Sequence, residues 1–111
     1  MTKHVIKVVK DFDPKPYGRT QADGDANGTK FRDLLLAPAL REFDKVVVDL
    51  TGYNRYGRSF LDEAFGGLIR ECDFTLEELE RKLEYKHDLV KSIELVIRDR
   101  LEAAERDKRS R

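Results

Sequence analysis

The chain has 111 residues, 40% of them charged, and its 22 Lys and Arg residues are balanced by 22 Asp and Glu residues. This length is typical of a single domain, and zero net charge provides no basic field to attract nucleic acid. The single cysteine excludes an internal disulfide, and no apolar run approaches the ~20 residues that span a bilayer. We therefore expect a cytoplasmic protein that binds neither nucleic acid nor membrane.

The N-terminal part of the chain predicts one strand and a long irregular segment. Residues 5–9 are short and mostly apolar, which predicts a strand that pairs beside a central one. Residues 11–27 contain two of the three prolines, which is typical of irregular structure. A short strand over residues 17–20 is compatible with this segment, whose length is more typical of a functional loop than of a simple connection.

A helix is predicted between residues 29 and 43, where apolar side chains recur at helical spacing. Either Asn27 or Thr29 can cap its first turn. Pro38 lacks a backbone N–H and crowds the turn before it, so we expect a kink or a break near Ala37.

The stretch from Lys45 to Ile69 combines a strand, a loop and a helix. The valine run at 46–48 is apolar on both faces, which predicts a strand covered on both sides. Ser59 is a good N-cap for the helix that follows, and Asp62 stands three residues later, as the partner in a capping box does. Strand, helix, strand and helix in this order predict an α/β domain with parallel strand pairing.

Four residues of this stretch have predicted structural roles. Gly52 can take the positive φ that a turn after the strand needs. Asp49, at the strand end, is expected to bond amides of its own loop. Gly66 and Gly67 lie inside the helix, where glycine costs about 1 kcal/mol relative to alanine. They predict close packing of the helix on the sheet, and the alternative is a thin helix face for a protein partner.

The C-terminal third allows two interpretations. Thr75 and Glu78 form a capping box that starts a short helix. In the first interpretation a strand follows at 83–87, and Asp88 caps a last helix. In the second, an apolar heptad makes one long helix that forms a coiled coil. In either case we expect a single domain over 1–111, with a core of about 3–105 and a frayed tail at 106–111.

The stretch VVVDLTGYNRYGRSFLDEAFGGLIR resembles the signature of STAS domains, which occur in sulfate transporters and anti-sigma-factor antagonists. Asp49-Leu50-Thr51-Gly52 matches the family's turn, Ser59 its second serine and Leu61 its leucine. A bacterial STAS-like family of unknown function is more similar. Its similarity covers roughly residues 12–106, with matches at Pro16–Arg19, Lys30–Arg32, Pro38–Leu40 and Phe60–Leu68.

This resemblance implies a fold and a departure from the wider family. The implied fold is a one-sided α/β domain with a mixed, mostly parallel sheet of about four strands, including a β-hairpin near 17–20 and a strand at 83–87. Arg58 stands where anti-sigma-factor antagonists have their phosphorylatable serine. Ser59 is therefore the candidate phosphoacceptor of this helix start.

The same resemblance implies a non-enzymatic regulatory module that docks through the loop and helix at 53–67 onto a protein partner. The implied partner is an ATPase of the histidine-kinase-like fold. Exposed aromatic residues and arginines are expected to anchor the contact, because they dominate interface energies. The candidate residues are Tyr53, Arg55, Tyr56, Gly57, Arg58, Ser59 and Phe60.

Two other functions remain open. Arg55, Arg58 and the free amides at the start of the 60–69 helix can form an anion or nucleotide sensor. The C-terminal helix can alternatively make the protein a homodimer.

The sequence contains no pattern that indicates catalysis. The segment from Gly57 to Ser59 begins like a nucleophile elbow, but position 61 is Leu where the motif requires Gly. Asp49, Asp62 and Glu63 have no second ligand at a spacing that is diagnostic of a metal site. We therefore expect no enzymatic activity, no cofactor and no metal.

Overall fold

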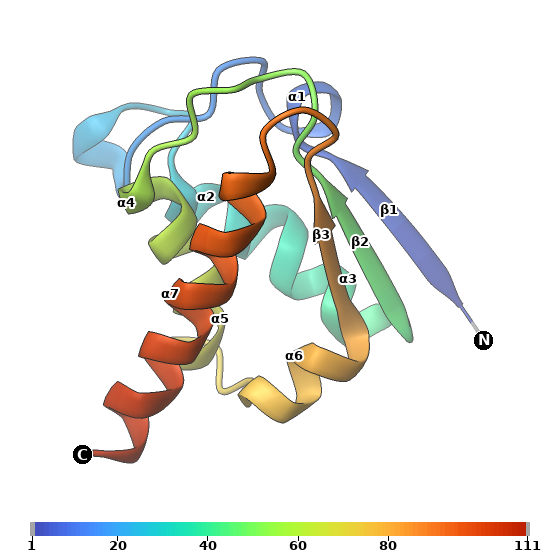
Figure 1. Ribbon diagram of the computed structural model, residues 1–111, viewed down its shortest axis with the longest axis vertical. Coiled ribbons are helices and arrows are strands. Elements are labelled where there is room, and N and C mark those ends of the chain that lie inside the picture. Colours follow the sequence, from blue (N-terminus) through green and yellow to red (C-terminus); the bar gives the residue numbers. More distant parts are fainter. Residues whose placement is uncertain (1, 111) are drawn as a thin grey trace.

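The computed structural model describes residues 2–110 as three parallel strands with helices packed against one face of the sheet (Figure 1). The strands are β1 (Lys3–Lys7), β2 (Lys45–Asp49) and β3 (Leu83–Lys86), in the spatial order β1-β2-β3. The predicted α/β class, the parallel pairing and the strand beside the central one are confirmed. The predicted fourth strand is wrong, because the sheet of the described residues has three strands.

The fourth strand and its hairpin were expected near residues 17–20, where the chain instead forms a loop. The loop bonds to the start of the next helix: Gly28 N–H donates to Gly18 C=O at 2.9 Å, and Thr29 N–H donates to Arg19 C=O at 3.1 Å. A 3₁₀ turn, η1 (Gln21–Asp23), follows. The backbone groups that a hairpin would need are therefore used elsewhere. Before this loop, the short helix α1 (Val8–Asp11) takes the last residues of the expected first strand.

The sheet has one covered and one open face. Ile6, Val46, Val48 and Leu83 are buried beneath the helices. Val47 points to the other face, so the prediction of a strand covered on both sides is wrong. Val47 is nevertheless 7% exposed, because Val5 and Glu84 flank it in register and the Lys45–Glu84 ion pair, at 3.3 Å, lies beside it.

The first long helix runs without a break from residue 28 to residue 42. It consists of α2 (Gly28–Phe31), the π-helical turn η2 (Arg32–Leu36) and α3 (Ala37–Glu42). Asn27 caps it, with its Oδ1 accepting Lys30 N–H at 2.8 Å. Of the kink or break expected near Ala37, the break is wrong, because the helix continues through Pro38. The helix is instead distorted just before Pro38, where Ala37 N–H donates to Arg32 C=O in a wider π-helical turn.

The central helix runs from residue 58 to residue 70 as α4 (Arg58–Leu61), the π-helical turn η3 (Asp62–Gly66) and α5 (Gly67–Arg70). Gly66 and Gly67 are buried and admit close packing, as predicted, but against arginines and helix α7 rather than the sheet. A Cβ on Gly66 would lie 2.8 Å from Arg70 Nη1 and 3.3 Å from Arg100 C=O, and one on Gly67 would collide with the Arg32 guanidinium. The alternative of a thin helix face for a partner is wrong, because both glycines are covered.

The C-terminal third follows the first of the two interpretations. The Thr75–Glu78 capping box starts α6 (Leu76–Lys82), and β3 separates it from α7 (Lys91–Arg109), so the single long helix is wrong. Asp88 does not cap α7, because Val90 precedes the helix and no side chain caps it. Helix α7 extends past the expected end of the core, and Lys108 Nζ donates to Ile69 C=O at 2.9 Å.

Two adjacent carboxylates of the central helix are surrounded by four arginines, three of which come from other parts of the chain. Asp62 lies 2.8 Å from Arg19, 3.1 Å from Arg70 and 3.6 Å from Arg100. Asp62 itself is 8% exposed. This carboxylate thus connects the central helix to the N-terminal loop and to α7.

Glu63 extends the same cluster to α2 and η2. Its Oε2 accepts from Arg32 Nη1 at 2.6 Å, and the same guanidinium donates to Glu63 C=O at 2.9 Å. Arg19 also reaches Glu63 at 3.2 Å. We call Asp62, Glu63 and these four arginines the carboxylate cluster.

Arginine contacts lower the pKa of both carboxyl groups. Burial alone would raise the pKa of Asp62 and of Glu63, but hydrogen bonds from Arg19 and Arg70 to Asp62, and from Arg32 and Arg19 to Glu63, outweigh it. Both carboxylates therefore stabilise the fold above their unfolded pKa of about 4, and this contribution is lost as the pH falls through the lower folded pKa.

The Glu63→Gln variant tests this linkage. We expect it to lower the free energy of unfolding by about 2 kcal/mol at pH 7, the scale of a hydrogen bond to a charged group. The difference from wild type should shrink below about pH 4, where Glu63 becomes protonated in the unfolded and then the folded chain. Urea unfolding across pH measures it, with exposed Glu77→Gln as the control. A difference that stays constant with pH would contradict the assignment.

Candidate functional site

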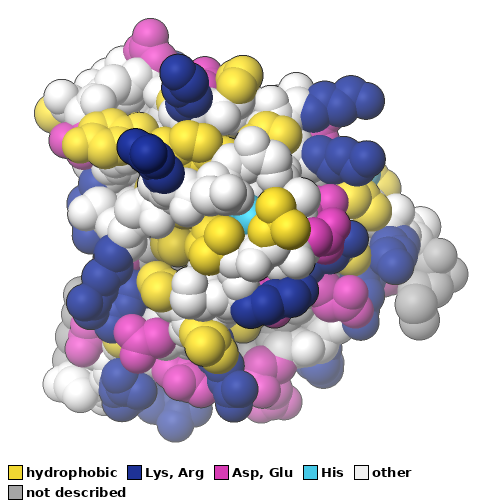
Figure 2. Space-filling view, turned by 45° about the horizontal axis from the view of Figure 1, so that its top comes forward, with side chains coloured by type: hydrophobic (Ala, Val, Ile, Leu, Met, Phe, Trp, Pro, Cys, Tyr) yellow, Lys and Arg dark blue, Asp and Glu magenta, His cyan; other side chains and the backbone are white. Residues whose placement is uncertain are grey.

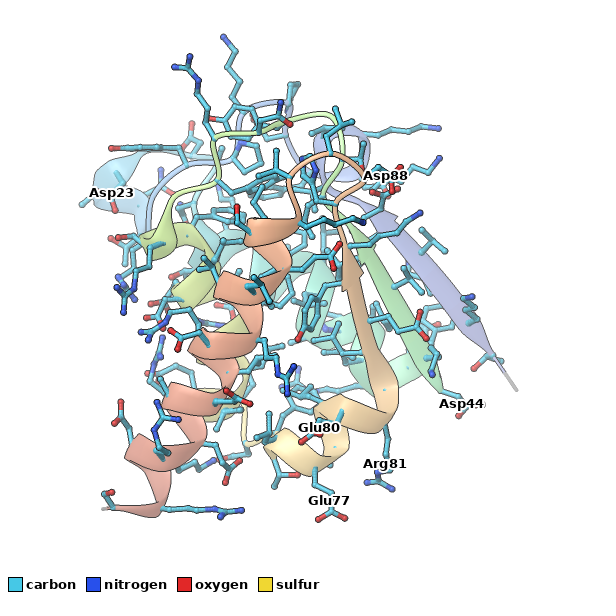
Figure 3. The ribbon with its side chains drawn as sticks, in the orientation of Figure 1. Asp23, Asp44, Glu77, Glu80, Arg81 and Asp88 are labelled. Carbon is cyan, nitrogen blue, oxygen red and sulfur yellow. The ribbon has the colours of Figure 1, made fainter. Side chains whose placement is uncertain are left out.

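The candidate site lies at the carboxyl end of the sheet. Because the three strands are parallel, the segments that follow them leave the sheet at the same end (Figure 1). Segment 50–57 connects β2 to α4, and segment 87–90 connects β3 to α7. Figure 3 places Asp88 at this end and Arg81 at the opposite end, on α6.

The turn after β2 is built by Asp49 and Gly52. Asp49 Oδ1 accepts Thr51 N–H at 3.0 Å, so the prediction that Asp49 bonds its own loop is confirmed. Burial alone would raise the pKa of Asp49, but the hydrogen bonds from Thr51 and the nearby Lys86 hold it below its ordinary value. Gly52 has φ of 110°, and a Cβ there would lie 2.9 Å from Val9 Cγ2, so this turn requires glycine.

His87 joins the two segments from a fully buried position. Its Nδ1 accepts Val90 N–H at 2.9 Å and Leu89 N–H at 3.1 Å. Nε2 therefore carries the proton and donates to Tyr53 C=O at 2.9 Å. Asp88 N–H adds a bond to Thr51 Oγ1 at 3.0 Å. The backbone of segment 50–57 is thus tied to the loop that precedes α7.

Two of the expected aromatic anchors are buried. Phe60 is fully buried and Tyr56 is 9% exposed, so the expectation that they are exposed is wrong. Both rings pack inward, with centroids 5.9 Å apart, and Phe60 also contacts Phe31. The Tyr56 hydroxyl is buried with no hydrogen-bond partner among the described residues. Burial, with the nearby Asp49 and Tyr53, raises the Tyr56 pKa.

The central helix beyond Ser59 is also covered. Residues 60–69 are buried except for half-buried Glu63, because α2 and η2 pack on one side of the helix and α7 on the other. Residues 60–67 of the expected docking surface at 53–67 are therefore largely unavailable to a partner, whereas Arg58 and Ser59 at the helix start remain exposed.

Ser59 does not cap the helix. Gly57 is the N-cap, and Ser59 is the second helical residue, with an exposed side chain that forms no hydrogen bond within the described residues. Asp62 does not complete a capping box, because Arg19 and Arg70 bind its carboxylate. Both cap predictions are wrong.

A small exposed surface remains at this end of the sheet. Arg55, Arg58 and Ser59 are exposed, Tyr53 is half-buried, and Leu89 of the neighbouring loop is 77% exposed. We call these five residues the edge surface. Neither arginine forms an ion pair within the described part of the chain, and Gly57 beside them is exposed. Figure 2 shows hydrophobic side chains and cations intermixed on the face that includes this end.

Sequence reasoning missed two features of the site. His87 and Leu89 lie more than thirty residues from Tyr53, and no local pattern indicates that they meet. The pairing of Asp62 and Glu63 with four arginines was likewise not apparent, because the arginines are dispersed from Arg19 to Arg100.

Residues 2–110 contain no group of three or more His, Cys, Asp or Glu side chains arranged to hold a metal ion. No helix among them has the length and apolarity needed to cross a membrane.

Comparison with protein families identifies residues 27–92 as a STAS-like domain of unknown function (DUF4325). The match covers more than half of the 111 residues. The chain belongs to this STAS-like family. The match includes segment 50–57, Ser59 and Leu89, whereas β1 and most of α7 lie outside it. Comparison with curated proteins and with solved structures found no match.

Proposed function

We propose that this STAS-like protein is a non-enzymatic regulatory module that docks onto a protein partner through the edge surface. The observation that carries the proposal is the pair of exposed arginines, Arg55 and Arg58, which have no ion-pair partner within the described residues. Half-buried Tyr53 and exposed Leu89 belong to the two segments at the same end of the sheet. Arginine and tyrosine are the residue types that contribute most to interface energies.

The fixed backbone of this surface supports docking. The bonds from His87 to Tyr53 and from Asp88 to Thr51 hold the two loops together before a partner arrives. A surface that is already ordered loses less conformational entropy on binding. Leu89, which is 77% exposed, adds apolar surface that a partner can bury.

The resemblance to anti-sigma-factor antagonists supports a partner of the histidine-kinase-like ATPase fold in a bacterial cytoplasm. Ser59 is the proposed phosphoacceptor, since its hydroxyl is exposed at the second helical position. A phosphate there would lie near the first-turn amides and beside Arg58, which favours negative charge. Mass spectrometry of protein purified from its host, with Ser59→Ala as control, tests this modification.

Arg58→Glu tests the docking proposal. Reversing this charge should weaken partner binding by about tenfold or more without a change in melting temperature, because Arg58 is exposed and unpaired within residues 2–110. Affinity purification from the host, followed by titration of the recovered ATPase, measures the effect. Arg81→Glu is the matched control, since Arg81 is exposed at the opposite end of the sheet (Figure 3). Equal recovery of the ATPase with Arg58→Glu and wild type would contradict the proposal.

An anion or nucleotide sensor is a second candidate, favoured by the uncapped start of the central helix. No side chain bonds the first-turn amides there, and Arg55 and Arg58 are close in sequence. A thirteen-residue helix, Arg58–Arg70, continues from this start. Unpaired amides and the helix dipole attract anions.

A melting series distinguishes this candidate. Phosphate, sulfate and nucleotides should raise the melting temperature of wild type in a concentration-dependent way if the helix start binds them. The increase should disappear in the Arg55→Ala/Arg58→Ala double variant and remain in Arg81→Ala. Identical melting temperatures with and without each anion would exclude the sensor and leave the docking proposal unaffected.

A further inference from the structure

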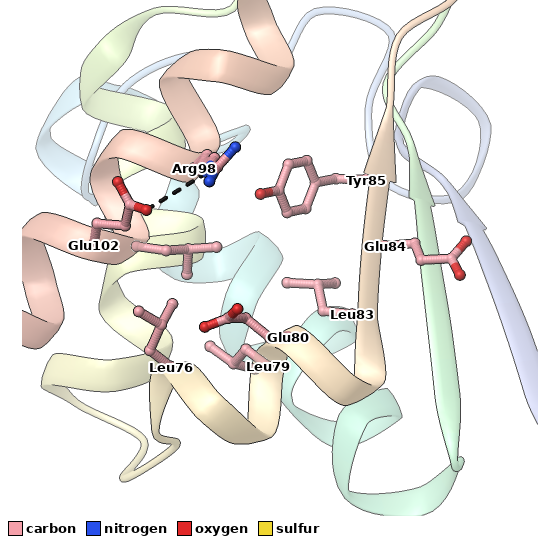
Figure 4. Close-up of a pocket in the computed structure, with 9 residues that line it drawn as sticks. Leu76, Leu79, Glu80, Leu83, Glu84, Tyr85, Arg98 and Glu102 are labelled. Atoms are coloured by element: carbon pink, nitrogen blue, oxygen red, sulfur yellow. Dashed lines mark ion pairs between the residues drawn. The ribbon is translucent and has the colours of Figure 1, made fainter.

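A second candidate interface lies away from the edge surface, in a groove between β3 and α7 that α6 closes at one end (Figure 4). The groove has a volume of about 480 Å³. Its apolar floor is formed by leucines of three elements: Leu76, Leu79, Leu83 and Leu101. None of the five edge-surface residues lines it. The groove is therefore a separate recognition feature.

One wall of this groove is an unpaired strand edge. β3 is an outer strand, and Lys86 C=O accepts Leu50 N–H at 2.8 Å. In a parallel ladder, Glu84 and Lys86 then bond to β2, and Tyr85 between them directs its N–H and C=O away from β2. Neither backbone group of Tyr85 has a partner among the described residues. An extended segment can pair with such groups.

The rim of the groove is acidic. Two carboxylates, Glu80 and Glu102, line it together with one cation, Arg98, whereas the Glu84 carboxylate points away from the groove (Figure 4). Arg98 pairs with Glu102 at 3.5 Å, and Glu84 pairs with Lys45 at 3.3 Å. Glu80 has no ion pair within the described part of the chain. Figure 4 shows Glu102 on α7, across the groove from β3 and Tyr85, and Glu80 on α6 at the end that this helix closes. The groove is thus complementary to a positively charged side chain.

We propose that this groove binds an extended segment of a partner protein that adds as a strand to the free edge of β3, with an apolar and a basic side chain two residues apart so that both point into the groove. The main chain of the segment would bond Tyr85, an apolar side chain would contact the leucine floor, and a basic one would pair with Glu80 and Glu102. A second copy of the same edge fits poorly, because it would place the acidic rims of both copies together.

Selection from a phage-displayed library of random linear peptides tests the proposal. We expect enriched peptides that carry an apolar and a basic residue at positions i and i+2, on the same face of the added strand. The affinity of these peptides for the Glu80→Lys/Glu102→Lys double variant should be lower than for wild type by about tenfold or more. A loss of this size corresponds to the loss of hydrogen bonds between charged groups. The affinity should be unchanged in Glu77→Lys, on the same helix but outside the groove, and in Arg58→Glu.

N-methylation of the enriched peptide tests strand addition itself. Methylating alternate residues in one register should abolish binding, and methylating the other register should leave it intact, since only one set faces Tyr85. Three results would overturn the proposal: no enriched basic peptides, affinity that the groove variants do not change, or equal tolerance of both methylation registers. If light scattering shows that the wild-type protein is a dimer and that the Glu80→Lys/Glu102→Lys variant is not, the free edge of β3 serves self-association instead.

Discussion

The carboxylates of Asp62 and Glu63 hold together the parts of the chain that the sheet does not connect. They face Arg19 of the N-terminal loop, Arg32 of η2 and Arg100 of α7. These contacts are largely buried, so a charge left without its partner would be strongly destabilising. The glycines that follow leave room for the guanidinium groups. The cluster therefore sets the spacing of the helices around the central one.

This arrangement determines which residues remain for function. Because the cluster and α7 enclose the central helix, its apolar and aromatic residues are committed to the core, including Phe60. The parts that remain exposed to solvent are the start of the helix, with Arg58 and Ser59, and the loop that precedes it. His87 then fixes that loop from the other side. A rigid, cation-bearing surface at the carboxyl end of a one-sided sheet follows from these two constraints.

Local patterns in the sequence predicted the elements better than their contacts. The valine run at 46–48 predicted the central strand, and Thr75 with Glu78 predicted the start of α6, because both signals act within a few residues. Ser59 was misassigned as a cap because its apparent partner, Asp62, binds arginines from distant segments. Tyr56 and Phe60 were expected to be exposed anchors, but Tyr56 packs against Phe60 and His87, and Phe60 packs against Phe31. Such contacts between distant residues cannot be predicted from neighbouring positions in the sequence. The strand that the family resemblance implied near residues 17–20 does not form, because backbone carbonyls of this segment accept hydrogen bonds from the start of α2.

The central claim is that the carboxylate cluster couples the helices, and a double-mutant cycle tests it most directly. The free energy of unfolding is measured by urea for wild type, Arg32→Met, Glu63→Gln and the double variant. We predict that the losses of unfolding free energy in the two single variants add up to about 0.5–3 kcal/mol more than the loss in the double variant. The reason is that either change alone leaves a buried charge without its partner. Additive losses would show that Arg32 and Glu63 act independently and would contradict the account.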